Sequence, residues 1–275
     1  MIFFPNAKIN IGLNIIKKRS DGYHEIESLF YPIPLKDSLE WIENKSIGLK
    51  AYEKNKNEVQ RLKEIEGSGN LVLKAYELLR NDFTLPDLEF FLIKNIPMGA
   101  GLGGGSSDGA FTLVKLNQYF ALGLSTNQLE KYAEKLGSDC AFFIENKPAL
   151  ASGRGEILQA HGLDLKGYYL ILVKPPFSIS TAEAYSGVIP KEPKFSLQTS
   201  LEKPIQEWKM EVFNDFENSL YPKFPELEKI KAKLYDQGAL YASLSGSGST
   251  LYGIFEREKT LPDLENKNEV FYITL

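Results

Sequence analysis

Pro97-Met98-Gly99-Ala100-Gly101-Leu102-Gly103-Gly104-Gly105-Ser106-Ser107-Asp108 is the stretch that decides the fold. Five glycines fall within seven of these residues, and glycine permits positive φ angles and a close approach of backbone to ligand. Apolar patterning predicts a strand at 88–96 and a helix at 109–120, with Ser106, Ser107 or Asp108 as the helix cap. A glycine loop leading into a helix predicts an anion site, most often for phosphate, because free N–H groups and the helix dipole attract negative charge.

Three other interpretations of this loop are less favoured. A glycine-rich turn without a ligand is costly in chain entropy. Gly99, Gly101 and Gly104 match the spacing of the dinucleotide fingerprint, but that motif needs a βαβ unit and an acidic residue about 20 positions later. Residues 125–136 instead predict another helix. A Walker A loop is excluded because no Gly-Lys-Ser/Thr follows the glycines.

Composition limits the class of protein and its partners. The chain has 275 residues, enough for one large domain or two ordinary ones. Its 43% hydrophobic and 25% charged content is typical of a soluble globular protein. With 32 basic and 36 acidic residues and no long basic run, a nucleic-acid partner is not expected. The longest apolar run, 168–173, is far shorter than the roughly 20 residues of a membrane span, so no membrane partner is expected.

Cysteine and histidine usage limits the site chemistry. Cys140 is the single cysteine, which excludes an intrachain disulfide and suits a reducing cytosol. No targeting segment is visible, so a cytoplasmic location is expected. The two histidines are His24 and His161, and Ser28 stands where a zinc-protease helix would need a second histidine after His24. No metal ligand is assigned.

The N-terminal residues 7–15 alternate with the period of a strand. One face is apolar and consists of Ala7, Ile9, Ile11, Leu13 and Ile15. The other face is polar and consists of Lys8, Asn10, Gly12 and Asn14. Two interpretations of a half-buried strand stay open: a solvated outer face, or a cleft wall that presents an ammonium and two amides.

Further elements follow from periodicity and turn residues. Strands are predicted at 23–33 (broken by Pro32 and Pro34), 39–42, 47–51, 168–173, 239–244 and 250–255, with two short strands within 149–160. Helices are predicted at 54–66, from Leu71 with Asn70 as N-cap, at 125–136 with Gly137 as C-cap, and at 181–187, 213–221 and 225–237. Residues 191–209 are predicted to be irregular and polar.

Two polar stretches have alternative interpretations. Asp139 is either a helix cap or a functional carboxylate. The small-residue loop 245–249 is either a flexible connection between strands or a backbone contact to the glycine loop. Strand and helix runs that are mixed without strict alternation predict an α+β fold. We place the domain boundary at 155/156, giving domains 1–155 and 156–275.

Three stretches together resemble the three motifs of the GHMP kinases (galactokinase, homoserine, mevalonate and phosphomevalonate kinases): 5–13, 97–107 and 243–249. Three more are similar to one branch of that family: 19–24, 101–107 and 136–140. The resemblance spans essentially the whole chain except 191–209. It implies a two-domain GHMP kinase fold, with a ribosomal protein S5 domain 2-like N-terminal half and a ferredoxin-like α/β C-terminal half.

The resemblance also implies an activity. The γ-phosphoryl group of ATP, accompanied by Mg²⁺, would pass to the 2-hydroxyl of a cytidine diphosphate-linked methylerythritol. ATP and that alcohol would be the small-molecule partners, and a monomer or weak homodimer is expected. Two alternatives remain open: another GHMP small-molecule kinase of the homoserine or mevalonate type, and a non-catalytic binding protein on the same fold.

Site residues are implied by the same resemblance. Asp139 would be the general base and Lys8 its electrostatic partner. The acceptor would be bound by Asn10, Tyr23, His24, Thr181 and Tyr185, with the two tyrosines on either side of the cytosine and His24 at its edge. The ATP phosphates would be bound by Pro97, Met98, Gly99, Ala100, Gly101, Leu102, Gly103, Gly104, Gly105, Ser106 and Ser107. Asn70 and Lys94 would lie near the adenine.

Overall fold

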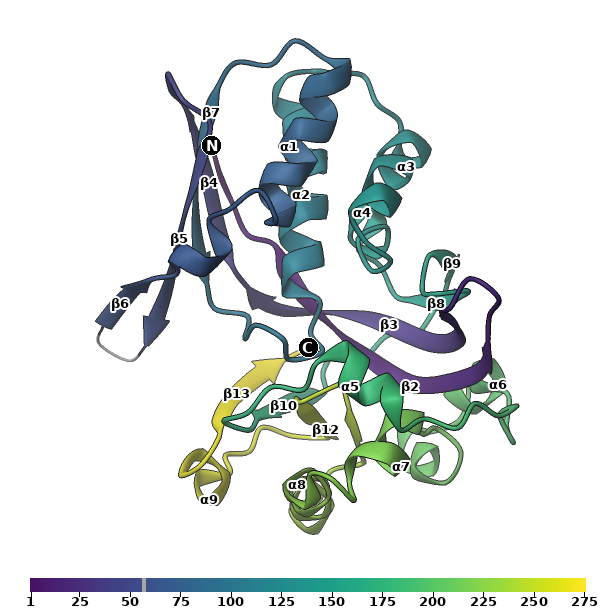
Figure 1. Ribbon diagram of the computed structural model, residues 1–275. Helices are drawn as coiled ribbons and strands as arrows, with labels where there is room; N and C mark the ends of the chain where they lie inside the picture. The colour runs from purple at the N-terminus through teal and green to yellow at the C-terminus, as the bar shows by residue number, and fades with distance from the viewer. Residues whose placement is uncertain (56–57) are drawn as a thin grey trace. The chain divides into compact units, whose positions relative to one another are not determined.

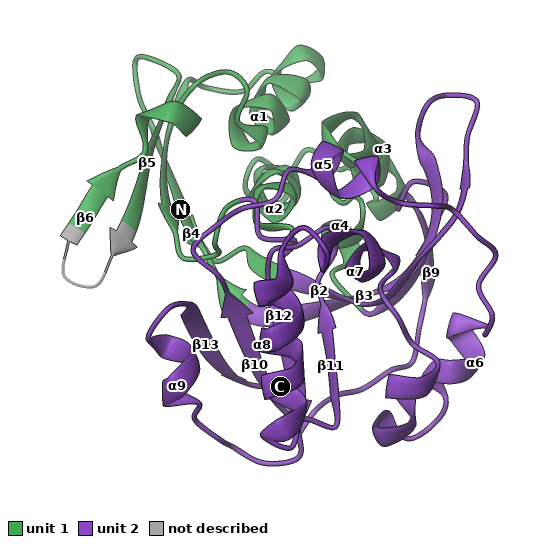
Figure 2. Ribbon diagram, turned by 60° about the horizontal axis from the view of Figure 1, so that its bottom comes forward, with its two compact units in different colours: residues 1–7, 35–98, 103–147 green, residues 8–34, 99–102, 148–275 purple. Residues whose placement is uncertain are grey.

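The computed structural model describes residues 1–55 and 58–275, and the chain divides into two compact units (Figure 2). Unit 1 comprises residues 1–7, 35–98 and 103–147. Unit 2 comprises residues 8–34, 99–102 and 148–275. Segments of the two units alternate along the chain, so the units are not divided by a single point in the sequence. The predicted boundary at 155/156 stays a prediction.

Unit 1 is a five-stranded sheet with helices on one face (Figure 1). Its elements are β1 (Ile2–Phe3), β4 (Ser38–Glu43), β5 (Gly48–Asn55), β6 (Glu58–Arg61), η1 (Lys63–Ile65), α1 (Leu71–Asp82), β7 (Leu88–Lys94), α2 (Gly104–Tyr119), α3 (Thr126–Leu136) and α4 (Phe142–Glu145). The strand order is β1-β4-β7-β5-β6, and the β5–β7 pair is parallel. Tyr76 of α1 meets Phe90 of β7 edge-on at 5.6 Å, and Tyr119 of α2 meets Trp41 of β4 at 5.8 Å.

Unit 2 contains two four-stranded sheets. Its elements are β2 (Asn6–Lys18, whose first two residues belong to unit 1), β3 (His24–Lys36, whose last two residues belong to unit 1), β8 (Ala149–Ser152), β9 (Ile157–Ala160), β10 (Tyr169–Lys174), α5 (Thr181–Ser186), α6 (Leu197–Leu201), η2 (Ile205–Met210), α7 (Asp215–Leu220), α8 (Pro225–Asp236), β11 (Tyr241–Leu244), β12 (Leu251–Phe255), α9 (Pro262–Glu265) and β13 (Glu269–Thr274). The sheets have the orders β2-β3-β8-β9 and β11-β12-β10-β13. Sheets and helices together confirm the predicted α+β class.

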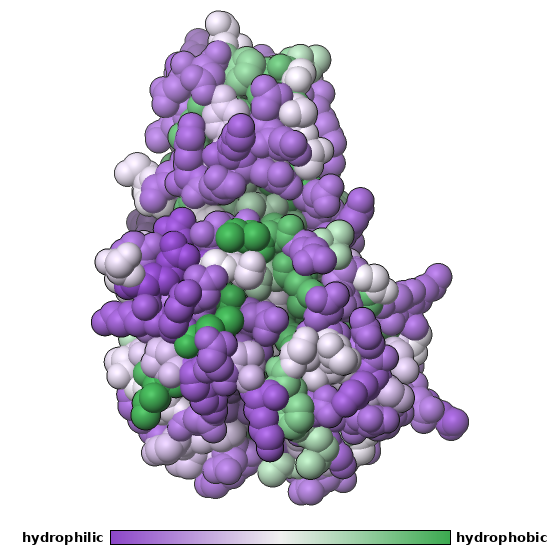
Figure 3. Space-filling model, turned by 90° about the vertical axis from the view of Figure 1, so that its right-hand side faces the viewer, coloured by the Kyte–Doolittle hydropathy of each residue, from purple (hydrophilic) through white to green (hydrophobic). Residues whose placement is uncertain are grey.

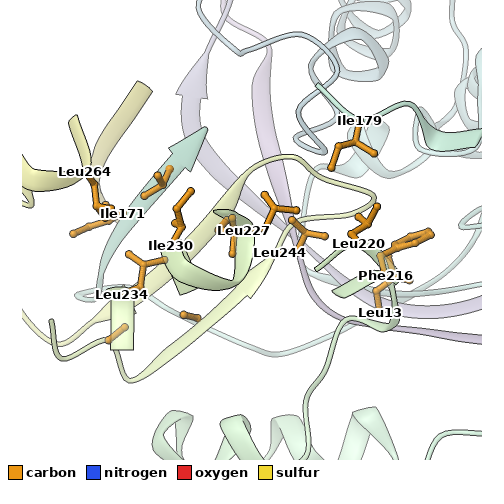
Figure 4. Close-up of a cluster of buried hydrophobic side chains, with 14 of the residues drawn as sticks. Leu13, Ile171, Ile179, Phe216, Leu220, Leu227, Ile230, Leu234, Leu244 and Leu264 are labelled. Atoms are coloured by element: carbon orange, nitrogen blue, oxygen red, sulfur yellow. The ribbon is translucent and has the colours of Figure 1, made fainter. Parts of the chain in front are cut away.

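The hydrophobic core of unit 2 lies between helices α7 and α8 and the sheet of β10–β13 (Figure 4). Leu227, Ile230 and Leu234 recur at helical spacing along α8 and form one buried face. They belong to the same buried cluster as Ile171 of β10 and Leu244 of β11. Strand β10 is buried along its whole length, as its continuous apolar run predicts.

The predicted N-terminal strand is confirmed as β2, but it is not half-buried. Lys8 is 3% exposed and Asn10 is 2% exposed, so the solvated outer face is wrong.

Strand β3 differs from the predicted strand at 23–33, since it continues through Pro32 and Pro34. Both prolines follow the residues that pair with β8, so no hydrogen bond of that ladder is lost.

The predicted exposed helix at 54–66 is wrong. Strand β5 extends to Asn55, β6 returns antiparallel to it, and a short 3-10 helix follows. Glu66, just after the 3-10 helix, ties this segment together: its carboxylate accepts from Arg61 Nε at 2.8 Å and from Ala51 N at 3.0 Å. Residues 56 and 57 of the predicted helix lie outside the described residues.

The prediction that 191–209 is irregular and polar is only partly right. Helices α6 and η2 form within it and bury Leu197, Ile205 and Trp208. The indole of Trp208 donates to Lys203 O at 3.0 Å and packs edge-on against Tyr241 at 5.6 Å. Enough apolar residues are spaced through this polar segment to anchor it to unit 2.

The neighbouring residues cover the free edge of β2. Lys191 N donates to Ile15 O at 3.0 Å, and Leu13 N donates to Phe213 O at 2.8 Å. The Asp215 carboxylate accepts from Ile15 N at 2.8 Å. An edge strand covered in this way cannot pair with another chain.

Polar residues cover most of the face drawn in Figure 3, in line with the ordinary charged content of the chain. In the part of the chain that the structure describes, no helix combines the length and apolar character needed to cross a bilayer.

Trp208→Ala tests the anchoring of the 191–209 segment. Loss of a fully buried indole is expected to lower the free energy of unfolding by about 3–5 kcal/mol, measured by urea denaturation. Met210→Ala is the matched control, because Met210 is 66% exposed and surface changes are usually within about 0.5 kcal/mol. Equal stability of the two variants would contradict the burial of this segment.

Candidate active site

The glycine loop passes from one unit to the other, with Gly99–Leu102 in unit 2 and the residues from Gly103 onward in unit 1. Helix α2 begins inside the glycine run, at Gly104, with Gly103 as N-cap at φ 70°. The predicted caps Ser106, Ser107 and Asp108 are therefore wrong, because all three lie inside the helix. A glycine cap supplies the left-handed conformation that other residues resist.

Free N–H groups stand at the start of α2. The first bond of its helical ladder runs from Ser107 N to Gly103 O at 2.9 Å. The N–H groups of Gly104, Gly105 and Ser106 precede that bond and so have no carbonyl one turn earlier in the helix. This is the arrangement that binds phosphate in other proteins.

The first turn of α2 packs against the side chains of Lys94 and Ile96, at and just beyond the end of β7. A Cβ added to Gly104 would lie 2.9 Å from Ile96 Cγ2 and 3.3 Å from Lys94 Nζ. A side chain at position 104 would therefore collide with Ile96 and crowd the Lys94 ammonium.

Lys94 is the centre of a buried ion cluster. Its ammonium donates to the Asp37 carboxylate and, at 2.8 Å, to Asp108 Oδ2. Asp37 Oδ1 also accepts from the backbone N–H groups of Asn95 at 2.6 Å and Ile96 at 2.8 Å. Burial, with Asp37 adding to it, raises the pKa of Asp108, and the Lys94 ammonium opposes that rise. No local sequence pattern predicts this cluster, because its three residues are distant in the chain.

The other half of the loop is fixed by backbone contacts within unit 2. Ser245 Oγ donates to Gly101 O at 2.8 Å, and Thr250 N donates to Ala100 O at 3.2 Å. Gly101 has φ +76°, and a Cβ there would lie only 2.0 Å from Ser245 O. The predicted contact between the 245–249 loop and the glycine loop is confirmed, and a merely flexible connection is wrong.

The buried polar face of β2 adjoins this contact. Lys8 N donates to Leu102 O at 3.0 Å, and Lys8 Nζ donates to Asn10 Oδ1 at 2.5 Å. Asn10 Nδ2 donates to Ser28 Oγ at 2.8 Å, and Tyr252 OH donates to Asn10 O at 2.8 Å. Lys8 and Asn10 are thus held by hydrogen bonds in unit 2.

Two of the predicted acceptor-binding side chains meet in unit 2. The imidazole of His24 stacks on the ring of Tyr185 at 4.6 Å, and Tyr185 meets Phe216 edge-on at 4.8 Å. Burial, aided by Lys18, lowers the pKa of His24, which favours a neutral imidazole. Tyr23 is 55% exposed, with the Arg154 guanidinium 4.9 Å from its ring centroid.

The remaining predicted residues lie at helix boundaries. Thr181 is the first residue of α5. Asn70 caps α1 as predicted, accepting from Val72 N at 2.9 Å. Gly137 ends α3 as predicted.

Asp139 does not cap the following helix, so that interpretation is wrong. The N-cap of α4 is Ala141, with no side-chain cap bond. Asp139 instead precedes the helix in a turn, beside Cys140. Burial raises the pKa of the Cys140 thiol to about 12, so this neighbour stays neutral.

Two family models match parts of the chain. The family model described as GHMP kinases N terminal domain matches residues 70–147. The one described as GHMP kinases C terminal matches residues 201–272. Both matches agree with the expected two-domain fold.

Individual relatives extend the similarity to nearly the whole chain. The chain is 50% identical over 273 residues to 4-diphosphocytidyl-2-C-methyl-D-erythritol kinase of Bacteroides thetaiotaomicron, covering 98% of each chain. It is 50% identical over 266 residues to the Bacteroides fragilis protein of that name, covering 96% of each. A crystal structure of 4-(cytidine 5'-diphospho)-2C-methyl-D-erythritol kinase matches with a TM-score of 0.81 and 28% identity, over 99% of this chain and 98% of that one.

Gly101→Ala tests the backbone contact at the glycine loop. The positive φ and the overlap with Ser245 O predict a loss of about 1–3 kcal/mol in the free energy of unfolding from backbone strain alone, measured by urea denaturation. Gly105→Ala is the control, because it lies within α2 and no described atom lies within 4 Å of its added Cβ. It is expected to stabilise by about 0.4–1 kcal/mol. The opposite ranking would show that the loop is not held as described.

Proposed function

The chain belongs to the GHMP kinase family, and we propose that it transfers the γ-phosphoryl group of ATP to the 2-hydroxyl of 4-diphosphocytidyl-2-C-methyl-D-erythritol. The observation that carries this proposal is 50% identity, over 98% of both chains, to a relative named for that acceptor. The homoserine and mevalonate alternatives are not favoured, since the most similar relatives described above share one name. A non-catalytic protein is disfavoured for the same reason.

The glycine loop is proposed to hold the triphosphate. Phosphoryl transfer asks a protein mainly for positioning and charge stabilisation. The N–H groups of Gly104, Gly105 and Ser106 at the start of α2 support this role. Asn70 and Lys94 remain proposed to lie near the adenine, Lys94 without contacting it because its ammonium is buried between Asp37 and Asp108.

Asp139 and Lys8 are proposed as the catalytic residues. In the step, the acceptor oxygen forms a bond to the γ-phosphorus, the bond from that phosphorus to the bridging oxygen of ADP breaks, and the hydroxyl proton passes to the Asp139 carboxylate. An alcohol gives up its proton late, so general-base help of about 10²–10⁴-fold is expected. The ammonium of Lys8 lowers the cost of developing alkoxide charge.

The acceptor is proposed to be recognised through its cytosine. Tyr23 and Tyr185 supply ring faces, His24 supplies a hydrogen bond to the base edge, and Asn10 and Thr181 supply polar contacts. A neutral imidazole, supported by the lowered pKa of His24, can both donate and accept such a bond. Since His24 already stacks on Tyr185, the cytosine has to share or replace that contact.

Mg²⁺ is proposed to arrive with ATP, held mainly by phosphate oxygens and water. It would neutralise phosphate charge during transfer. Within residues 1–55 and 58–275, no group of three or more His, Cys, Asp or Glu side chains could hold a metal ion, so no protein ligand is assigned. A cytoplasmic location and a monomer or weak homodimer complete the proposal.

Asp139→Asn tests the proposed base. It keeps the size of the side chain but cannot take up the proton, so the rate of acceptor-dependent ADP formation is expected to fall at least about 100-fold. Glu145→Gln removes an exposed carboxylate from the adjacent helix α4 and is expected to keep the parental rate. Activity of Asp139→Asn within tenfold of the parent would refute the assignment.

Tyr23→Ala tests the cytosine contact. Loss of one stacked aromatic is worth about 1–3 kcal/mol, so KM for the cytidyl acceptor is expected to rise about 5- to 150-fold. KM for ATP in the same assay serves as the internal control and is expected to stay within twofold. An unchanged acceptor KM would indicate an acceptor without a base, as in other kinases of the family.

A further inference from the structure

The Asp37–Lys94–Asp108 cluster joins three segments of unit 1 beneath the first turn of α2. Lys94 is the last residue of β7, Asp37 precedes β4, and Asp108 is the fifth residue of α2. Lys94 is separated by 57 residues from Asp37 and by 14 from Asp108. The cluster therefore fixes α2 against the sheet through one ammonium.

Both carboxylates are fully enclosed, and they are held differently. Asp37 has, in addition to Lys94, two backbone N–H groups on its other oxygen. Asp108 is held by Lys94 through Oδ2, while its Oδ1 is buried with no hydrogen-bond partner among the described groups. The orientation of the Asp108 side chain consequently depends on Lys94.

The same ammonium also lies near the helix start. A Cβ added to Gly104 would lie 3.3 Å from Lys94 Nζ, so the ammonium is close to the backbone whose N–H groups are proposed to meet phosphate. Lys94 itself is 4% exposed. A side chain so enclosed, with its charge shared between two carboxylates, is poorly placed to contact a nucleotide directly.

We propose that Lys94 is a positioning residue for ATP. It acts through Asp108 and the Gly104 backbone to hold the first turn of α2 in the geometry that binds the triphosphate. This inference rests on the proposed function for its ligand, and on the contacts of unit 1 for its mechanism.

Electrostatics and positioning predict opposite effects for one substitution. A carboxylate near a phosphate site repels the ligand, so removing the charge of Asp108 alone would tighten ATP binding. If Asp108 instead anchors the helix start to Lys94, removing its charge loosens the loop and weakens binding. The sign of the change therefore distinguishes the two explanations.

Asp108→Asn is the decisive variant, with affinity for ATP–Mg²⁺ measured by calorimetry in the absence of acceptor. We expect Kd for ATP to rise about tenfold, the size of one charge-assisted hydrogen bond. In steady-state assays KM for ATP is expected to rise similarly, with KM for the acceptor and kcat within threefold. Binding equal to or tighter than that of the parent would overturn the positioning role.

A double-mutant cycle tests whether Lys94 acts through Asp108. Lys94→Met alone is expected to weaken ATP binding at least as much as Asp108→Asn. The double variant is expected to bind no more weakly than Lys94→Met, because coupled residues are not additive. Full additivity would refute the coupling. If Lys94→Met does not fold, Asp108→Asn alone decides the matter.

Lys231→Met is the matched control for general loss of stability. Its ammonium pairs with Glu217 at 2.5 Å in unit 2, and the pair is largely buried. It is expected to lower the thermal midpoint without changing the ATP affinity. Measurements on the unsubstituted protein separate the proposed function from the positioning role of Lys94. If that protein binds ATP but phosphorylates a different acceptor, only the proposed acceptor is refuted. If it does not bind ATP, both the proposed function and the positioning role are refuted.

Discussion

Backbone packed directly against backbone is the constraint on which the loop architecture depends. At Gly101 the chain approaches Ser245 O so closely that a single Cβ would overlap it. Hydrogen bonds from Ser245 Oγ and Thr250 N then fix the neighbouring carbonyls. Small residues in both loops are thus required by geometry, and the second loop supports the shape of the first.

The second half of the loop depends on a different interaction. Here Gly104 leaves room for the Lys94 ammonium near the helix start, and two buried carboxylates compensate that charge. Buried ions are costly unless each is paired and hydrogen-bonded. This cluster satisfies most of its groups and leaves one Asp108 oxygen unsatisfied. Packing fixes one half of the loop, and paired charges fix the other.

Local patterns in the sequence predicted the elements and several contacts of the loop. Alternation at 7–15, the apolar run of β10 and the spacing of Leu227, Ile230 and Leu234 all gave the correct element type. Side-chain pairs distant in sequence leave no such local signal, which is why the Lys94 cluster and the position of Arg154 beside Tyr23 were missed. The helix predicted at 54–66 is wrong, since this segment forms the end of β5, strand β6 and a short 3-10 helix. The roles of Asp139, Lys8 and the acceptor-binding residues come from resemblance and stay proposals.

The thiol at position 140 has a chemical consequence for the residue before it. Its protonated form dominates at neutral pH, since burial raises its pKa to about 12, and only a thiolate reacts readily with electrophiles. Alkylating reagents and peroxide therefore have little to attack next to the carboxylate of Asp139. The sulfur atom next to the proposed base is therefore buried and held in its unreactive, protonated form.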